Sequence, residues 1–338
     1  MEICGIEHNA LCPFLQHVRY LRSAHMNVDD PQSPNIDPPR RSEFGFSAEA
    51  TATVKYCIIT PVRDEEQFVR GTIDSVLHQT IKPVEWIIVD DGSKDATNSI
   101  ISRYAQEYSW IRTSRRENRG HRSTGGGVEA FLAGYQLLRS QDWEYLANLD
   151  GDLTFASDYF EKCFKFFHEM PRLGIGGGTI YDKVDARLQL ESSPTFHVRG
   201  GTKIYRRKCW EQLGGLPPSL GWDTVDELKA NQLGWITRTF PDLRLIQHRA
   251  TGSAWGRWGN AVNDGVADYV VGYHPLFFFL KCLRHIFHAP YIVRSLGLAY
   301  GFLRSWVSRM PRLGDQELRD YLRQQQLRRL LGAPSIWK

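Results

Sequence analysis

The sequence predicts an α/β fold with a mostly parallel central sheet between two layers of helices. Short apolar runs rich in β-formers alternate with helical periodicity from residue 55 to residue 149, and this alternation is typical of parallel sheets covered by helices. Two pairs of aspartates, Asp90 with Asp91 and Asp150 with Asp152, fall at the carboxyl ends of predicted strands. Because α/β proteins bind ligands beyond the carboxyl ends of their strands, these carboxylates are the first candidates for a site.

The first half of the fold is predicted element by element from apolar spacing. Helical spacing predicts helices over 68–79, 95–108 and 127–140, the second of them opened by Asp95. The predicted strands that alternate with them span 54–62, 84–93, 110–115 and 144–149.

After Met170 the pattern becomes mixed. A short helix over 208–215 is expected to stop at Gly214 and Gly215, because glycine is the usual residue just past a helix end. A second helix is predicted over 224–233. The predicted strands of this half span 175–182, 186–193, 200–207, 235–240 and 243–248.

Composition restricts the function classes. The chain has 338 residues, 42% hydrophobic and 24% charged, with a net charge of +4. This is ordinary globular material, and the mild charge does not point to a nucleic-acid protein. The six cysteines are scattered without a Cys-x-x-Cys spacing, which argues against a zinc cluster or a disulfide framework and fits a reducing cytosol. No signal peptide and no membrane-spanning segment is predicted.

Three regions are expected along the chain. Residues 1–54 are predicted to be a flexible extension, because prolines and charges in "DDPQSPNIDPPRRS" resist packing. Residues 55–260 are expected to form the catalytic domain. Residues 261–338 are expected to form a C-terminal amphipathic helical region.

The segment "LDGDLT" around Asp150 and Asp152 allows three interpretations. In the first, Asp150 ends a strand and Asp152 caps a helix near Ala156. In the second, the Asp-x-Asp-x-Thr form belongs to a haloacid-dehalogenase-like phosphatase with Asp150 as its nucleophile. That family places the motif on its first strand, however, and here three strand–helix units precede it. In the third, the two carboxylates hold Mg²⁺ or Mn²⁺ against a diphosphate, since these ions prefer carboxylate oxygens.

The third interpretation uses both acidic clusters. The segment "IITPVRDEEQFVRGTIDSVLHQT", followed by "VEWIIVDDGSKDAT" and "NLDGDL", resembles the family-2 glycosyltransferases. The resemblance runs from about Lys55 to His248. It implies the GT-A fold, a single Rossmann-like α/β/α sandwich, followed here by C-terminal helices.

The resemblance also assigns residues to roles. It implies that Asp91 binds the base or ribose of the donor, with Asp90 beside it, and that Asp152 and Asp150 bind the metal. Gly200 and Gly201 match a loop bordering the donor sugar and acceptor, although a tight turn explains them equally. The remaining nucleotide contacts implied by the resemblance are Thr60, Pro61, Val62 and Glu65.

The resemblance places the catalytic base at a helix start, eleven residues before a Gly-aromatic pair. Counting back from Gly234 gives Asp223, where the family's usual Glu-Asp pair is replaced by Trp222 and Asp223. Asp226 and Glu227 are the alternatives. A helix N-cap with Asp226 as its capping-box partner would also explain Asp223.

Two further contacts are expected at the diphosphate. Arg119 and Arg122, in "ENRGHRSTGGGVEAF", could border it together with the helix start at Gly127. A flexible loop with solvated arginines is the alternative. His248 matches a histidine that many GT-A enzymes add to the metal or diphosphate, and a purely structural histidine is its alternative.

The segment from His274 to about residue 304 combines charge with apolar residues. As a helix it would carry a basic stripe of Lys281, Arg284, His285 and His288 beside phenylalanines. Such a helix suits the headgroup region of a membrane, and equally a helical hairpin packed on the catalytic domain.

The resemblance implies an inverting, metal-dependent transfer of sugar from a nucleotide-diphosphate sugar to a saccharide or lipid-linked hydroxyl. A UDP-sugar is the favoured donor, with GDP- and dTDP-sugars as alternatives. The expected setting is cell-envelope or extracellular polysaccharide synthesis, in the cytoplasm or at the inner face of the plasma membrane. A non-catalytic saccharide-binding relative is the third alternative, beside the phosphatase.

Overall fold

The computed structural model describes residues 54–118, 120, 126–184, 187–190, 193–218, 221–249, 256–287 and 292–337. The chain divides into two units, Met1–Ala50 and Thr51–Lys338, and every described residue belongs to the second unit. The predicted N-terminal extension therefore lies outside the described residues, apart from Val54.

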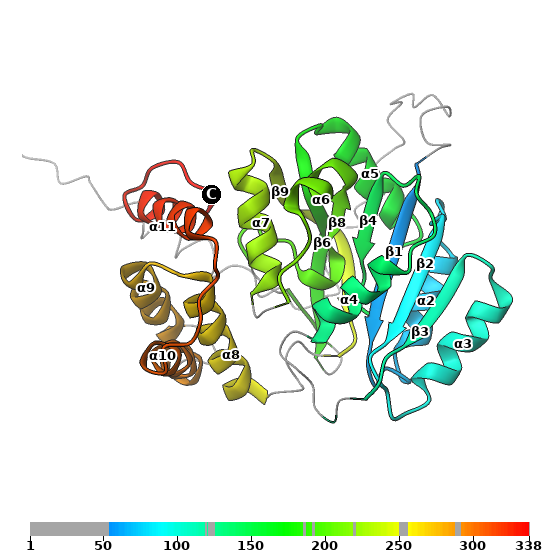
Figure 1. The fold of residues 1–338 in the computed structure, drawn as a ribbon, viewed down its shortest axis with the longest axis horizontal. Helices are drawn as coiled ribbons and strands as arrows, with labels where there is room; N and C mark the ends of the chain where they lie inside the picture. The colour runs from blue at the N-terminus through cyan, green and yellow to red at the C-terminus, as the bar shows by residue number, and fades with distance from the viewer. Residues whose placement is uncertain are drawn as a thin grey trace, which may run out of the picture. The chain divides into compact units, whose positions relative to one another are not determined.

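The first half of the sheet is parallel, as predicted (Figure 1). Its four strands lie in the order β3-β2-β1-β4, and each neighbouring pair runs in the same direction. The strands are β1 (Tyr56–Val62), β2 (Glu85–Asp90), β3 (Ile111–Arg115) and β4 (Tyr145–Asn148). The connecting helices are α2 (Val69–Leu77), α3 (Thr97–Glu107) and α4 (Gly126–Gln136).

Antiparallel pairs extend the sheet beyond β4. Strand β8 is antiparallel to both β4 and β6, β9 is parallel to β6, and β5 is antiparallel to β9 at the far edge. Strand β7 pairs with β6 away from this path. These strands are β5 (Leu153–Phe155), β6 (Leu173–Val184), β7 (Arg187–Leu190), β8 (Ile204–Arg206) and β9 (Ile236–Gln247).

Two predictions about this half were wrong in detail. The segments predicted as separate strands over 235–240 and 243–248 form one strand, β9, whose pairing with β6 jumps from Phe240 to Arg244. Pro241 lies in this irregularity, where a residue without an amide donor is tolerated. Asp152 does not cap a helix near Ala156, because strand β5 follows it directly. The next helix, α5 (Tyr159–Glu169), begins later.

Each face of the sheet buries its own core. Along β1 the side chains alternate. Tyr56 and Ile58 join the cluster formed with α2, α3 and α5. Cys57 and Ile59 join the cluster formed with α4 and with α6 (Arg207–Leu213). This is the predicted arrangement of helices on both faces.

The second half of the domain contributes two short elements that border the candidate active site described below. The 3-10 turn η1 (Gly200–Thr202) leads into β8, and α7 (Trp222–Gln232) packs near it. Helix α6 ends at Gly214, which has φ +71°, as predicted for a glycine just past a helix end.

Four helices complete the described chain, namely α8 (Gly256–Val271), α9 (Pro275–Ile286), α10 (Ile292–Val307) and α11 (Gln316–Leu330). They lie on the side of α7 away from the sheet (Figure 1). Apolar residues of α7, α8 and α11 share one cluster: Val225, Leu228, Val271, Leu318 and Leu322. None of the helices in the described part of the chain is long and apolar enough to cross a membrane.

The predicted basic stripe of α9 is wrong at its first member. Lys281 turns inward, and its Nζ contacts the Asp268 carboxylate of α8 at 2.7 Å and 3.0 Å. The sequence pattern could not reveal this because α8 was not predicted. Arg284 is exposed and His285 half-buried, while His288 lies outside the described residues.

Candidate active site

The acidic turns meet at one edge of the sheet. Strand β1 lies between β2 and β4, and all three run in the same direction. Asp90 pairs with Val62 at the end of β2, while the Leu149 amide donates to the Ile59 carbonyl at 3.1 Å, just before Asp150. The two turns are therefore separated by two strand spacings of roughly 4.8 Å each. This separation suits a ligand the size of a nucleotide.

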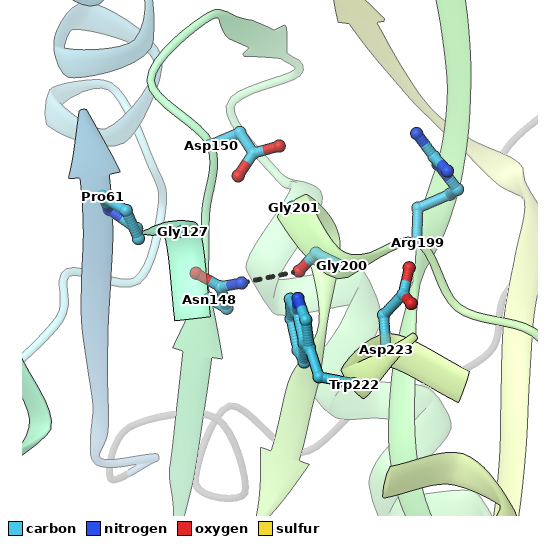
Figure 2. Close-up of a pocket in the computed structure, with 9 residues that line it drawn as sticks. All are labelled: Pro61, Gly127, Asn148, Asp150, Arg199, Gly200, Gly201, Trp222 and Asp223. Carbon is cyan, nitrogen blue, oxygen red and sulfur yellow. Dashed lines mark hydrogen bonds between the residues drawn. The ribbon is translucent and has the colours of Figure 1, made fainter. Parts of the chain in front are cut away.

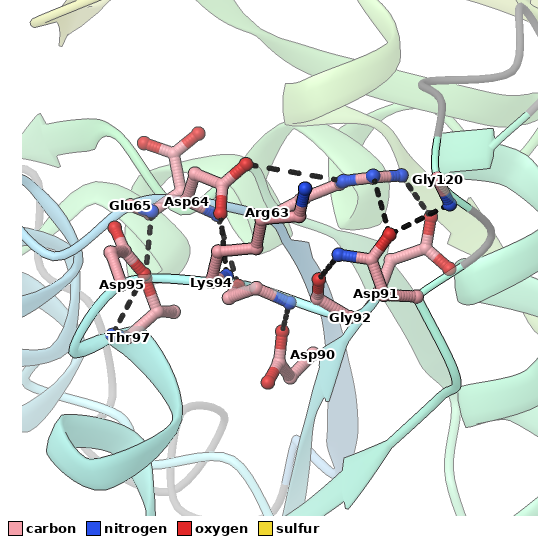
Figure 3. A network of polar contacts seen from close by, with 12 residues as sticks. Arg63, Asp64, Glu65, Asp90, Asp91, Gly92, Lys94, Asp95, Thr97 and Gly120 are labelled. Atoms are coloured by element: carbon pink, nitrogen blue, oxygen red, sulfur yellow. Dashed lines mark hydrogen bonds and ion pairs between the residues drawn. The ribbon is translucent and has the colours of Figure 1, made fainter.

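The turn after β2 is held by charged groups (Figure 3). Asp90 Oδ1 accepts from the Ser93 amide at 2.7 Å. Asp91 Oδ1 accepts from Arg116 Nη1 at 2.8 Å, and Arg63 Nη1 lies 3.9 Å from Asp91 Oδ2. Gly92 has φ +79°, and an added Cβ would lie 2.6 Å from the backbone of Asn118. Glycine is therefore required here for turn geometry.

Residues at the end of β1 and in the turn after it mainly hold the neighbouring turn in place. The Thr60 hydroxyl is fully buried and accepts from Trp86 Nε1 at 2.9 Å. The Val62 carbonyl accepts from the Asp91 amide at 2.8 Å, which ties the two turns together. Glu65 forms an ion pair of 3.0 Å with Arg249.

Asp150 and Asp152 lie between this turn and the loop of η1. The Asp150 amide donates to the Gly201 carbonyl at 3.0 Å. A Cβ added at Gly201 would lie 2.1 Å from Asp150 Oδ2, so only glycine fits against this carboxylate. Asp152 is buried, and its Oδ2 accepts from Gln247 Nε2 at 3.2 Å.

The donor set fits a divalent cation shared with a ligand. Burial, and then the neighbouring Asp152, raise the pKa of Asp150 to about 7. Burial raises the pKa of Asp152 as well, and the repulsion between the two neighbouring carboxylates favours a cation beside them. Among the described residues no three His, Cys, Asp or Glu side chains are grouped to hold a metal by themselves. Mg²⁺ is commonly held by one or two carboxylates and the substrate's phosphates, and this site matches that pattern.

His248 is placed near the acidic pair by backbone pairing. Its amide donates to the Asp152 carbonyl at 3.0 Å. Its Nε2 lies 2.8 Å from Thr154 Oγ1, and its ring stacks on Phe68 at 6.2 Å. Burial lowers the pKa of His248, which favours the neutral imidazole.

A pocket of about 190 Å³ opens beside Asp150 (Figure 2). Its lining includes predicted residues from five separate segments, with Asp150 on one side and Asp223 on the other. Sequence reasoning gave no role to Asn148 or Arg199, which carried no recognisable spacing. The lining consists of Pro61, Gly127, Asn148, Asp150, Arg199, Gly200, Gly201, Trp222 and Asp223.

Asp223 lies in the first turn of α7, after Gly221 with φ +78° at the N-cap. The predicted capping box is therefore not formed. Burial would raise the pKa of Asp223, but His197, Lys203 and Arg199 lower it below its ordinary value. The carboxylate is thus held ionised, as a proton acceptor requires.

The alternative bases, Asp226 and Glu227, have different surroundings. Asp226 accepts from Lys203 Nζ at 2.6 Å and from the Tyr205 hydroxyl at 2.7 Å. Glu227 accepts from the Val198 amide at 2.7 Å and contacts His197 Nδ1 at 2.9 Å. Both carboxylates are buried away from the pocket lining.

Lys203 connects the buried carboxylates of Asp226 and Glu227. Its side chain is fully buried, and its Nζ contacts Asp226, Glu227 at 3.1 Å and the Asp223 carbonyl. The ammonium also lies 5.4 Å from the Trp222 ring. Since Lys203 follows η1 directly, it links the glycine loop to the first turn of α7. Arg119 and Arg122, the predicted diphosphate contacts, lie outside the described residues.

Comparison with known proteins finds a family that this chain resembles. The model described as "Glycosyl transferase family 2" matches residues 57–219. This segment is similar to a family-2 glycosyltransferase domain. Its acidic turns, η1 and pocket lining up to Gly201 fall within the matched segment, whereas Trp222 and Asp223 follow it.

Curated relatives of the family-2 domain are distant and longer. The chain is 30% identical over 162 residues to the glycosyltransferase GlyA of Streptococcus pneumoniae, covering 47% of this chain and 20% of that protein. It is 32% identical over 105 residues to the uncharacterized glycosyltransferase EpsJ of Bacillus subtilis, covering 31% of this chain and 28% of that protein. The match therefore spans less than a third of either relative's length.

Solved structures confirm the GT-A fold. The mannosyltransferase PcManGT from Pyrobaculum calidifontis, solved with GDP-Man and Mn²⁺, has a TM-score of 0.51 and 17% identity, covering 92% of this chain and 86% of that one. GalNAc-T7, solved with UDP, GalNAc and Mn²⁺, has a TM-score of 0.53 and 15% identity, covering 84% of this chain and 55% of that one. The predicted α/β class and GT-A architecture of the family-2 domain are thereby confirmed.

Proposed function

We propose that this chain transfers a sugar from a nucleotide-diphosphate sugar to an acceptor hydroxyl, with inversion at the anomeric carbon. The observation that carries the proposal is the placement of Asp91 and Asp150 at one sheet edge, with Asp223 across the pocket from Asp150. The family-2 match and the nucleotide ligands of the structural neighbours support it. A UDP-sugar is the favoured donor, and GDP- or dTDP-sugars are the alternatives.

The nucleoside is assigned to the β1 and β2 ends. There Asp91, held by Arg63 and Arg116, would accept a hydrogen bond from the base or ribose. Asp90, Thr60, Val62 and Glu65 act as framework for this side, since their side chains or carbonyls are engaged within the turns. Pro61 borders the pocket itself.

The cation is assigned to Asp150 and Asp152, with His248 beside them. When bound, Mg²⁺ or Mn²⁺ would neutralise charge on the leaving diphosphate. Arg122 is proposed to border the same diphosphate. Gly200 and Gly201 keep the wall opposite Asp150 open, because an added Cβ at either position would crowd the ring of Trp222 or the Asp150 carboxylate.

The base is assigned to Asp223. Its ionised carboxylate would take the proton of the acceptor hydroxyl as that oxygen attacks the anomeric carbon from the face opposite the diphosphate. Lys203 and Arg199 favour the ionised form of Asp223 through their positive charge. Asp226 and Glu227 would keep Lys203 in place and take no proton from the acceptor.

The acceptor is proposed to be a saccharide or a lipid-linked hydroxyl, in cell-envelope or extracellular polysaccharide synthesis. Peripheral membrane contact through residues 274–304 and a place at the inner face of the plasma membrane belong to the same proposal. Four described cysteines are buried free thiols, as expected in a reducing compartment. The division into a catalytic domain over 55–260 and a helical region over 261–338 stays a prediction.

Nucleotide-sugar turnover by three variants tests the proposal. Asp91→Ala and Asp152→Ala should each abolish turnover with Mn²⁺ present. A phosphatase with Asp150 as nucleophile would lose phosphate release in Asp150→Asn and keep it in Asp91→Ala. A wild-type protein that binds saccharide but leaves every nucleotide sugar intact would favour the non-catalytic alternative.

A further inference from the structure

Helix α10 buries mostly small residues and exposes most of its large apolar residues. The buried face consists of Ser295, Gly297, Leu298, Gly301 and Ser305. A Cβ added at Gly301 would lie 2.1 Å from the Val262 carbonyl of α8, and one at Gly297 would lie 2.6 Å from the Ala261 Cβ. Small residues that let helices approach this closely are typical of packing in membranes.

Helices α9 and α10 each expose large apolar side chains. On α10 the exposed positions follow helical spacing from Leu296, 57% exposed, to Trp306, 60% exposed. Phe287, just after α9, is 78% exposed. We define the α9–α10 apolar surface as Leu276, Phe279, Leu280, Leu283, Phe287, Ile292, Val293, Leu296, Tyr300, Leu303, Trp306 and Val307.

Helices α9 and α10 carry only basic charged side chains, and two of these pair with Asp264 and Asp268 of the neighbouring α8. From Tyr269 to Gly314 the sequence contains six Lys or Arg residues and no Asp or Glu. Lys281 is engaged with Asp268, while Arg284, Arg304, Arg309 and Arg312 are exposed. Apolar residues beside exposed arginines, on helices that carry no carboxylate of their own, complement the anionic headgroups of a bilayer.

Helices α9 and α10 are too short to span a lipid bilayer. Helix α10 has 16 residues, which corresponds to about 24 Å at 1.5 Å per residue, against a hydrocarbon core of about 30 Å. None of the described helices qualifies as a span. An apolar surface of this kind would therefore lie along the headgroup region.

We infer that the α9–α10 apolar surface docks this protein onto an anionic lipid bilayer. The inference rests on the membrane contact in the proposed function, and it replaces the predicted basic stripe by an apolar surface with arginines beside it. A second copy of the chain would also cover apolar residues, but it would not explain the run without carboxylates.

The docking surface lies next to the proposed acceptor side of the pocket. Helix α8, which packs α10 through the glycines, carries Asp264, and Arg294 of α10 lies 3.6 Å from that carboxylate. Helix α8 also packs against the start of α7, because a Cβ added at Gly221, next to Trp222 and Asp223 of the pocket, would lie 2.8 Å from Val271 and 3.5 Å from Ala267. Docking would thus bring the base near the bilayer, where a lipid-linked hydroxyl is presented.

Vesicle flotation of the full chain tests the inference. The wild type should float with phosphatidylcholine vesicles that contain phosphatidylglycerol, and less with phosphatidylcholine alone. The double variant Leu296→Glu and Trp306→Glu should bind at least about tenfold more weakly. Its matched control, Leu188→Glu and Leu331→Glu, changes side chains that are 53% and 83% exposed outside the surface, and should float as the wild type does. Arg304→Gln and Arg309→Gln should each weaken anionic binding about fivefold.

Three results would overturn the inference. They are a wild type that floats with neither vesicle, a double variant that floats normally, and a wild-type dimer that the double variant turns into monomer without any flotation. If the double variant is unfolded by circular dichroism, Phe287→Glu replaces it. Nucleotide-induced thermal stabilisation without vesicles, measured on the same proteins, separates failed docking from a failed sugar-transfer proposal.

Discussion

Removal of the Lys203 charge should destabilise the fold far more than removal of an exposed charge. In Lys203→Met the carboxylates of Asp226 and Glu227 lose a fully buried partner at 2.6 Å and 3.1 Å. Removing one partner of a buried pair costs about 3–5 kcal/mol, because the other charge stays desolvated. At about 2–4 °C for each kcal/mol, the midpoint of thermal unfolding should fall by about 6–20 °C.

The control is a pair of similar chemistry at the surface. Arg103 lies 3.1 Å from Glu107 on α3, with side chains 72% and 47% exposed, and Arg103→Met should cost about 0.3–0.5 kcal/mol. Differential scanning calorimetry measures both variants. The double variant Lys203→Met with Asp226→Asn should recover part of the loss, since one stranded charge is removed.

The same substitution should also move the pH profile of turnover. Lys203 is one of the charges that lower the pKa of Asp223, so Lys203→Met should shift the acidic limb of the profile upward. A Lys203→Met protein whose unfolding midpoint lies within about 2 °C of the wild type would refute this prediction. The loss of a buried partner would then lower the free energy of unfolding no more than the loss of an exposed one.

Three further predictions concern the pocket and its support. Asp223→Asn should lower turnover about 10²–10⁴-fold with nucleotide binding retained, and unchanged turnover would exclude Asp223 as the base. Gly201→Ala should weaken nucleotide binding in calorimetric titration, because its Cβ would displace Asp150, while Gly314→Ala, with nothing within 4 Å, should not. His197 is half-buried, and desolvation opposes its charge, but Glu227 raises its pKa above the ordinary 6.5. The charged His197–Glu227 pair therefore contributes fully to stability below pH 6.5, and this contribution is lost as the pH rises through the raised pKa that His197 has in the folded protein. In urea unfolding, His197→Gln should therefore lower the free energy of unfolding more at low pH than at high pH.

Much of the fold followed from apolar spacing. The buried runs around Ile58, Ile88 and Ala147 became β1, β2 and β4, because strands covered on both faces require continuous apolar sequence. Strand β5 was missed because three residues carry no usable period. Helix α8 was not predicted as a separate helix, although most of it lies in the predicted helical region 261–338, and the inward turn of Lys281 toward Asp268 was therefore missed.

The site residues that could be predicted are those in sequence motifs typical of turns after strands. Asp91 and Asp150 follow strands, and Asp223 was located by spacing from Gly234. Lys203 and Arg199 were not predicted, because their importance depends on η1 lying against α7, a contact between segments that no local pattern encodes. The distinction between Asp223 at the pocket and Asp226 in the buried group likewise required the packed structure.

Thermal unfolding with nucleoside diphosphates, with and without Mn²⁺, tests the central claim most directly. If the two acidic turns bind one nucleotide and one cation, one nucleotide should stabilise the wild type only when Mn²⁺ is present, by about 2.7 kcal/mol at a hundredfold excess over its Kd. Asp91→Ala and Asp152→Ala should each lose this stabilisation. Stabilisation by no nucleotide, or equal stabilisation of the wild type and both variants, would contradict the account.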